Sequence, residues 1–234
     1  MAKIEIVFDT ETTGVKVDEG HRVVEIGCVE LDNLIPTGRT FHCYINPERD
    51  MPLGAFEIHG LSTEFLSDKP TFAQIADDFL AFIADAGLVA HNADFDFGFI
   101  NAELDNIGRP PISNSRKVDS WRMAQRLFPG QASSLDALCR RFEIDLSART
   151  KHGALLDAEL LAEVYLNLKG GRQTRLDLGS NLAGGASDQV ISIHKKRQSI
   201  TAREHHLCPQ ERARHEAFVS EMPNALWARY DVAE

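Results

Sequence analysis

Two carboxylates stand two residues apart at the end of the first apolar run. Asp9 and Glu11 follow the run 4–8, and threonines and a glycine bound it at 12–14, so the pattern predicts a buried strand. Because alternate strand side chains point to one face, the two carboxylates share a face. Burying them together is costly unless a cation compensates, and a divalent metal with oxygen ligands is the simplest one. Two acids in a surface turn are the alternative interpretation of this pair alone.

Two further acids each begin an apolar helical stripe. Asp96 comes shortly after the apolar run 88–90, and Asp157 begins a second stripe later in the chain. The stripes continue at helical spacing through Phe99, Ile100, Leu104 and Ile107, and through Leu160, Leu161, Val164 and Leu168. An acid on an inward-looking helix face needs a partner. His152 lies five residues before Asp157, off that helix face, so we expect it in the preceding loop, free to move toward a substrate.

The order and spacing of these residues resemble the three motifs of the DEDDh exonuclease family. The first motif is Asp9 with Glu11, the second is Asp96, and the third is His152 with Asp157. The resemblance runs from about residue 3 to 170 and implies an RNase H-like α/β fold, with a mixed central sheet flanked by helices. Within the family, segment 149–166 is most similar to the proofreading subunits of bacterial replicative DNA polymerases. Segment 57–61 resembles the stretch that these enzymes place beside the terminal nucleotide. Asp94 stands where the family pattern leads us to expect a small residue.

The resemblance implies a metal-dependent 3′–5′ exonuclease that proofreads DNA. Asp9, Glu11, Asp96 and Asp157 are then the ligands of two divalent cations, Mg²⁺ or Mn²⁺, and His152 is the general base for the attacking water. The alternative for His152 is a capping or core histidine. We expect the terminal nucleotide to contact Thr12, Thr13, Ile58, His59 and Phe95, although Ile58 and Phe95 are also compatible with core positions.

Composition agrees with an intracellular enzyme. The chain has 234 residues, enough for one full-size domain and an appendage, and a formal net charge of -10. This charge argues against sequence-blind coating of nucleic acid, which uses basic surfaces. The four cysteines, Cys28, Cys43, Cys139 and Cys208, lack paired metal spacing, so free thiols in a reducing compartment are expected. There is no apolar run of membrane length and no signal-peptide pattern, so we expect a cytoplasmic protein without a membrane partner.

The pattern of elements predicts an antiparallel meander of three strands, followed by strands added through helical crossovers. Strands are expected at 3–9, 22–31, 39–46, 87–90 and 116–118, and helices at 71–85, 94–107, 119–128, 133–142 and 154–168. Helix starts are expected at Pro70-Thr71, before Trp121 and at 133–136. We expect three parts: an exonuclease domain (1–170), a flexible linker (171–199) and a polymerase-binding segment (200–234).

The linker contains a short motif of its own. Gln173, Leu176 and Leu178 resemble the peptides that bacterial replication proteins insert into the sliding clamp. The alternatives are a linker that happens to contain two leucines, or continued helix packing.

The tail regains a helical pattern, with capping signals at 201–204 and 208–211. Phe218, Leu226, Trp227 and Tyr230 are candidate anchors for a partner, which the resemblance implies to be the polymerase catalytic subunit. The alternative is that they fold back on the exonuclease domain. The need for a small accessory subunit stays open. The rival functions are a stand-alone nuclease that trims RNA or DNA ends, and a scaffold that joins polymerase to clamp.

Overall fold

The computed structural model describes residues 4–147, 151–171 and 208–221. The first two ranges belong to one compact unit, and the third belongs to a second unit, which is described by itself below. The predicted clamp peptide and the anchors Leu226, Trp227 and Tyr230 lie outside the described residues.

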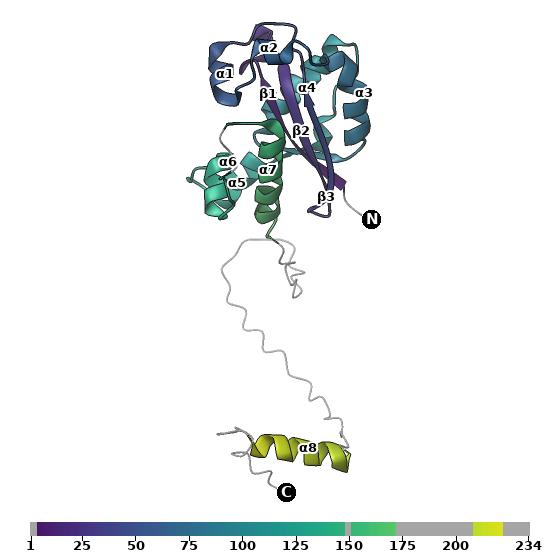
Figure 1. The fold of residues 1–234 in the computed structure, drawn as a ribbon, viewed down its shortest axis with the longest axis vertical. Coiled ribbons are helices and arrows are strands. Elements are labelled where there is room, and N and C mark those ends of the chain that lie inside the picture. Colours follow the sequence, from purple (N-terminus) through teal and green to yellow (C-terminus); the bar gives the residue numbers. More distant parts are fainter. Residues whose placement is uncertain (1–3, 148–150, 172–207, 222–234) are drawn as a thin grey trace, which may run out of the picture. The chain divides into compact units, whose positions relative to one another are not determined.

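A five-stranded mixed sheet forms the centre of the first unit (Figure 1). Its strands are β1 (Ile4–Thr12), β2 (Val23–Asp32), β3 (Ile35–Tyr44), β4 (Gly87–Ala90) and β5 (Lys117–Asp119), in the order β3-β2-β1-β4-β5. The first three strands pair antiparallel, β4 is parallel to β1, and β5 is parallel to β4. The predicted meander with helical crossovers is therefore confirmed.

The β2–β3 hairpin is tighter than the sequence indicated. Strand β3 begins at Ile35 and not at residue 39, because a turn of only two residues joins it to β2. Asn33 and Leu34 both have positive φ, 49° and 70°, as a type I′ hairpin turn requires. Asn33 is a common residue for such a turn, but Leu34 is not, so the sequence pattern did not predict this turn.

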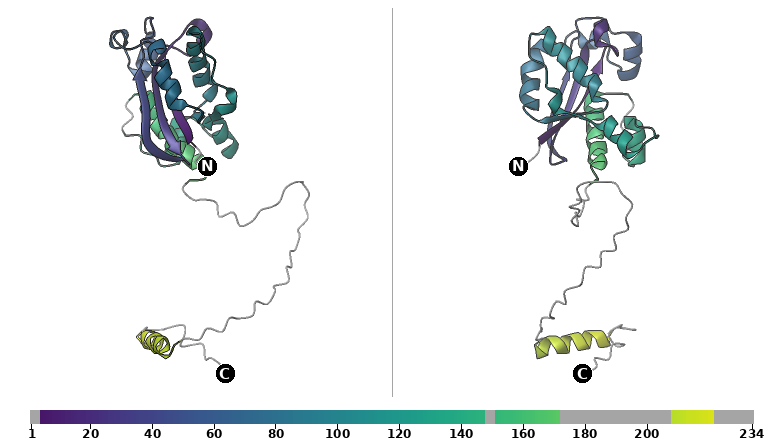
Figure 2. Two further views of the ribbon diagram at one scale, coloured as in Figure 1. Left: turned by 90° about the vertical axis from the view of Figure 1, so that its right-hand side faces the viewer. Right: turned by 180° about the vertical axis from the view of Figure 1, so that it is seen from behind.

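Helices cover both faces of the sheet (Figures 1 and 2). The five predicted helices are present as α3 (Phe72–Ile83), α4 (Ala93–Asn106), α5 (Ser120–Leu127), α6 (Leu135–Arg141) and α7 (Ala154–Leu168). Helices α3 and α4 pack on the face that carries Ile6 and Phe8 of β1, whereas α5, α6 and α7 pack on the face that carries Val7. The alternation of β1 thus divides the apolar core into two layers.

Local capping explains where several helices begin. Thr71 and Gln74 form a capping box at α3, the Asp119 side chain accepts the N–H groups of Trp121 and Arg122 at α5, and Ser134 caps α6. The three predicted helix starts are therefore confirmed.

Four short helices were not predicted: α1 (Leu53–His59), α2 (Thr63–Leu66) and the 3₁₀ turns η1 (Val17–Glu19) and η2 (Asn114–Arg116). They are too brief to show an apolar period.

In the second unit, α8 spans Pro209–Ser220. Cys208 is its N-cap and Pro209 lies in its first turn, as the sequence predicted. The side chain of Phe218 is exposed. No helix among the described residues is long and apolar enough to cross a membrane.

Candidate active site

Strand β1 carries Asp9 and Glu11 to its C-terminal end. Their Cα partners on β2 are Gly27 and Glu25, so the two acids share the sheet face on which α7 packs. Glu11 is 9% exposed, and Asp9 is half-buried. The structure therefore gives these two side chains the common face that their spacing predicted.

Gly27 allows the start of α7 to lie directly on the sheet beside Asp9. A Cβ atom at Gly27 would be 2.2 Å from the backbone nitrogen of Leu155 and 2.3 Å from the carbonyl carbon of Ala154. Backbone atoms cannot move aside as a flexible side chain can, so this position requires glycine for the observed packing. We did not predict this role, because nothing in the local pattern shows what packs on a strand glycine.

His152 and Asp157 meet at the start of α7. The Nδ1 atom of His152 lies 3.0 Å from Oδ2 of Asp157. His152 is in the loop before the helix, as predicted, and its side chain is 50% exposed, whereas that of Asp157 is 4% exposed. Ligand atoms of Glu11, His152 and Asp157 all lie within 4.8 Å of one another. The structure thus brings two motifs that are far apart in sequence into one cluster.

Asp96 approaches the end of β1 from the opposite face. It lies in the first turn of α4, is 2% exposed, and its Oδ1 accepts a 2.7 Å hydrogen bond from the hydroxyl of Thr10. Burial raises the pKa of Asp96 to about 7, and the hydrogen bond from Thr10 opposes this shift. The sequence pattern does not single out Thr10, because its side chain points away from Asp9 and Glu11, yet its hydroxyl bonds to Asp96.

Four of the five predicted nucleotide contacts lie at the end of β1 and on α1, and the fifth, Phe95, lies on α4. The ring of His59 is buried, its Nδ1 accepts the N–H of Leu61 at 3.1 Å, and burial lowers its pKa. Ile58 beside it is 54% exposed, which excludes the core alternative for this residue. The hydroxyl of Thr12 donates to the Gly14 carbonyl at 2.7 Å.

Thr13 and Phe95 have partners within the protein. The hydroxyl oxygen of Thr13 accepts the N–H of Arg22 at 3.0 Å and lies 3.1 Å from Nδ1 of His21. Phe95 is half-buried, with its ring centroid 4.9 Å from that of Phe99. Thr13 is 0% exposed, so its hydroxyl holds the turn together and does not face a nucleotide, contrary to the prediction.

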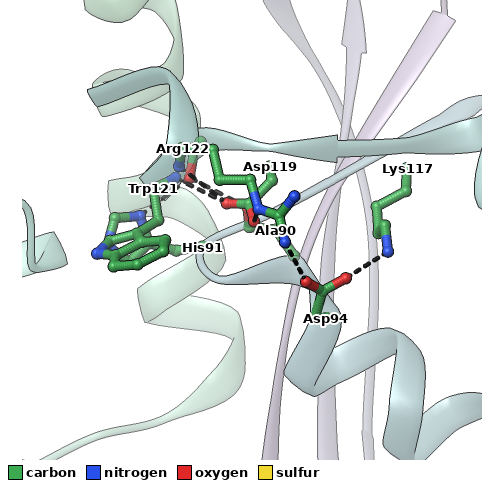
Figure 3. A network of polar contacts seen from close by, with 8 residues as sticks. Ala90, His91, Asp94, Lys117, Asp119, Trp121 and Arg122 are labelled. Carbon is green, nitrogen blue, oxygen red and sulfur yellow. Dashed lines mark hydrogen bonds and ion pairs between the residues drawn. The ribbon is translucent and has the colours of Figure 1, made fainter. Parts of the chain in front are cut away.

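Asp94, which departs from the family pattern, has cationic partners (Figure 3). Its carboxylate forms ion pairs with Lys117 of β5 and, at 2.6 Å, with Arg122 of α5. These cations hold the pKa of Asp94 below its usual range, with Lys117 contributing most. The acid ties α4 to the β5–α5 connection, so its departure from the pattern has a structural reason.

Comparisons with known proteins agree with this geometry. The model of the RNase T exonuclease family matches residues 6–165. The nuclease domain of 3′hExo, a DEDDh family member bound to rAMP, superimposes with a TM-score of 0.62 at 16% identity, covering 72% of this chain and 94% of that one. This likeness shows the DEDDh fold. The chain belongs to the RNase T exonuclease family.

Relatives narrow the class further. DNA polymerase III subunit epsilon of Rickettsia typhi is 47% identical over 223 residues, which cover 93% of this chain and 96% of the relative. The protein of the same name from Escherichia coli K12 is 51% identical over 175 residues, which cover 72% of each chain. The chain is accordingly a 3′–5′ proofreading exonuclease of the epsilon type.

Proposed function

We propose that the chain hydrolyses the terminal phosphodiester of a mispaired DNA 3′ end, releasing nucleoside 5′-monophosphates, with Asp9, Glu11, Asp96 and Asp157 as the metal ligands. The observation that carries this proposal is the gathering of Glu11, His152 and Asp157 within 4.8 Å beside the end of β1. The donor set fits two Mg²⁺ or Mn²⁺ ions, since hard divalent cations prefer carboxylate oxygens. When bound, such ions activate a water and stabilise the leaving 3′ oxygen.

His152 is the general base in this scheme. The 3.0 Å contact with Asp157 orients the imidazole, and a side chain that is 50% exposed is accessible to a water molecule. Histidine is the side chain that most often serves as a general base in such steps. His152→Ala should therefore lower turnover severely while the fold is retained. A nearly wild-type rate in this variant would exclude the assignment.

The substrate end is held by contacts that tolerate any base. We place Ile58 and Phe95 against the terminal base, with Thr12 and His59 beside the nucleotide; the 54% exposure of Ile58 supports this placement. Thr13 is left out of this set because it is 0% exposed. Selection of mispaired ends then follows from fraying, because less unpairing energy is needed to bring a mismatched terminus into a single-strand site.

The partners follow from the epsilon-type relatives. We propose that residues 1–170 form the exonuclease domain and that segment 200–234, with Phe218, Leu226, Trp227 and Tyr230, binds the catalytic alpha subunit of DNA polymerase III in the cytoplasm. The exposed side chain of Phe218 supports this role. Linker 171–199 would contact the sliding clamp through Gln173, Leu176 and Leu178, and tethering would make even a weak peptide effective. Clamp pull-down with Leu176→Ala and Leu178→Ala tests this; unchanged retention removes the clamp contact.

The central test is digestion of 3′-end-defined substrates in Mg²⁺ by the purified chain. Single-stranded DNA, matched and mismatched primer-templates and single-stranded RNA are compared, with Asp9→Ala as the inactive variant and Asp77→Ala, at an exposed acid, as the matched control. We expect DNA to be degraded from the 3′ end, fastest at the mismatch, and not by Asp9→Ala. Preferential RNA degradation would favour an end-trimming nuclease, and no metal-dependent activity would favour the scaffold.

A further inference from the structure

The loop that carries His152 lies against α1, the helix that carries Ile58 and His59. The backbone N–H of His152 donates to the carbonyl of Ile58 at 3.4 Å, a long hydrogen bond. The ammonium of the neighbouring Lys151 lies over the ring of Phe56, 5.3 Å from its centroid, within the range of a cation–π interaction. Two adjacent residues of the loop thus contact a single turn of α1.

Gly60 completes the surface on which Lys151 lies. It ends α1 in the left-handed conformation, with φ of 77°, and its N–H donates to the Phe56 carbonyl at 2.8 Å. A Cβ atom at Gly60 would be 2.8 Å from Nζ of Lys151 and 2.9 Å from its Cδ. The lysine side chain therefore runs directly over the glycine and reaches the aromatic ring beyond it.

The Lys151 charge also acts on the substrate side of α1. It contributes to the lowered pKa of His59, after burial, which is the main cause. His59 lies between Phe56 and Gly60 in the chain, so Lys151 spans the segment proposed to hold the terminal nucleotide.

We propose that Lys151 is a positioning residue that fixes His152 relative to the nucleotide-binding turn of α1. The proposal rests on the proposed function, in which His152 is the general base. The cation–π contact between Lys151 and Phe56 is a second link between loop and helix, beside the 3.4 Å backbone hydrogen bond. Small displacements of a catalytic group lower the reaction rate strongly. Loss of the contact between Lys151 and Phe56 should therefore lower kcat and leave KM nearly unchanged.

A second role for an exposed lysine beside an active site is a direct contact with DNA phosphate. The two roles differ in their response to salt, because each phosphate contact adds to the slope of log affinity against log salt. A positioning residue leaves that slope unchanged. A phosphate contact raises KM when removed and makes the slope shallower.

The test compares Lys151→Met, Lys151→Arg and Lys151→Ala in the full-length chain. Lys151→Met keeps an unbranched side chain over Gly60 but loses the charge over Phe56, and Lys151→Arg restores the charge. Lys69→Met is the matched control, because the ammonium of Lys69 lies 4.6 Å from the ring centroid of Phe65. This variant removes a cation–π contact that does not involve the His152 loop. Steady-state kinetics on single-stranded DNA are measured from low to moderate salt.

We expect kcat to fall roughly three- to tenfold in Lys151→Met and further in Lys151→Ala, with the arginine variant close to wild type. KM and the salt slope stay unchanged, and Lys69→Met behaves as wild type. A Phe56→Leu variant should lower kcat by a similar factor, and combining it with Lys151→Met should add little.

Three results would overturn the inference: wild-type kcat in all Lys151 variants, a loss confined to KM with a shallower salt slope, or full additivity with Phe56→Leu. Each leaves the proposed function standing if the wild-type chain degrades DNA 3′ ends. An inactive wild-type chain would instead remove the proposed function and this inference together.

Discussion

Two acids of α4 are buried to the same degree but held in opposite ways. Asp96 and Glu103 are each 2% exposed and stand two helical turns apart. Glu103 accepts two hydrogen bonds from the guanidinium of Arg22, at 2.8 and 2.7 Å, and a third from the N–H of Val23 at 3.1 Å. Asp96 accepts from the neutral hydroxyl of Thr10, and among the residues that the structure describes no lysine or arginine forms an ion pair with it.

The difference separates a structural acid from a site acid. Glu103 is neutralised by a cation of the chain, and it raises the pKa of Arg22 by hydrogen bonding. Burial without such a cation raises the pKa of Asp96 to about 7. A buried acid costs stability unless something compensates its charge, so Asp96 is the acid that needs an external cation. Burial alone therefore does not distinguish the proposed metal ligand Asp96 from the structural acid Glu103, whereas the presence of a cationic partner does.

The largest expected effect is on catalysis at Asp96. Asp96→Asn keeps the shape and the contact with Thr10 but removes the charge that a cation requires. We expect kcat on single-stranded DNA to fall roughly a thousandfold, because metal stabilisation of transition-state charge is worth several kcal/mol. Rates are measured in Mg²⁺ and again in Mn²⁺, with circular dichroism to verify the fold. A loss smaller than about tenfold in both metals would break the contrast with Glu103.

The corresponding change at Glu103 should act on stability. Glu103→Gln leaves the Arg22 guanidinium without its carboxylate, and breaking a buried pair costs roughly 3–5 kcal/mol in the free energy of unfolding. Urea unfolding measures this loss. The kcat of the folded variant should stay within about threefold of wild type, since Glu103 is bonded to Arg22 and Val23 and not to a proposed catalytic residue. Replacing both partners, Arg22→Met with Glu103→Leu, should recover part of the stability.

The pH dependence of stability tests the environment of Asp96 next. The pKa of Asp96 is raised to about 7 in the folded chain, above the unfolded value of about 3.9. Between these values the folded state holds a proton that the unfolded state has lost, so stability falls as pH rises from about 4 to about 7. In the presence of EDTA, Asp96→Asn should therefore be more stable than wild type by roughly 2–4 kcal/mol at pH 8 and equal to it near pH 4.

Added divalent cation supplies the control for this measurement. Mg²⁺ should stabilise wild type at pH 8 more than Asp96→Asn, because only the ionised carboxylate gains a partner. If the free energy of unfolding depended on pH equally in the two proteins in EDTA, Asp96 would be ionised in the folded state without a metal. That result would contradict the contrast between Asp96 and Glu103.

Much of the fold was predictable, because it depends on local patterns. Helix α7 shows an apolar stripe at helical spacing, and its end at Leu168 is followed by Gly170 and Gly171, both with positive φ. Strand β1 was recognised from its apolar run, and its alternation assigned Asp9 and Glu11 to one face. These signals lie within a few residues of one another.

What could not be predicted depends on contacts between distant segments. Thr10 meets Asp96 at a separation of 86 residues, and Arg22 meets Glu103 at 81, so the sequence gives no indication of which buried acid has a cation. The candidate site residues could be predicted from their types and spacing. The residues that hold them in place could not be predicted in this way. Gly27 is the clearest case, since its role is visible only when the backbone of α7 lies on it.

The smallest expected effect is at Asp94, which tests whether the comparison depends on burial. Asp94 lies two residues before Asp96 and has two cationic partners, where Glu103 has one, but its side chain is 49% exposed. Exposed ion pairs contribute about 0–1 kcal/mol, so Asp94→Ala should change the free energy of unfolding by no more than about 1 kcal/mol and kcat by less than about twofold. Urea unfolding at low and high salt, together with kinetics, measures both quantities. A large loss of activity would mean that the ion pairs with Lys117 and Arg122 set the position of the first turn of α4. The cationic partners of the exposed Asp94 would then matter to the site as much as the lack of a cationic partner at the buried Asp96.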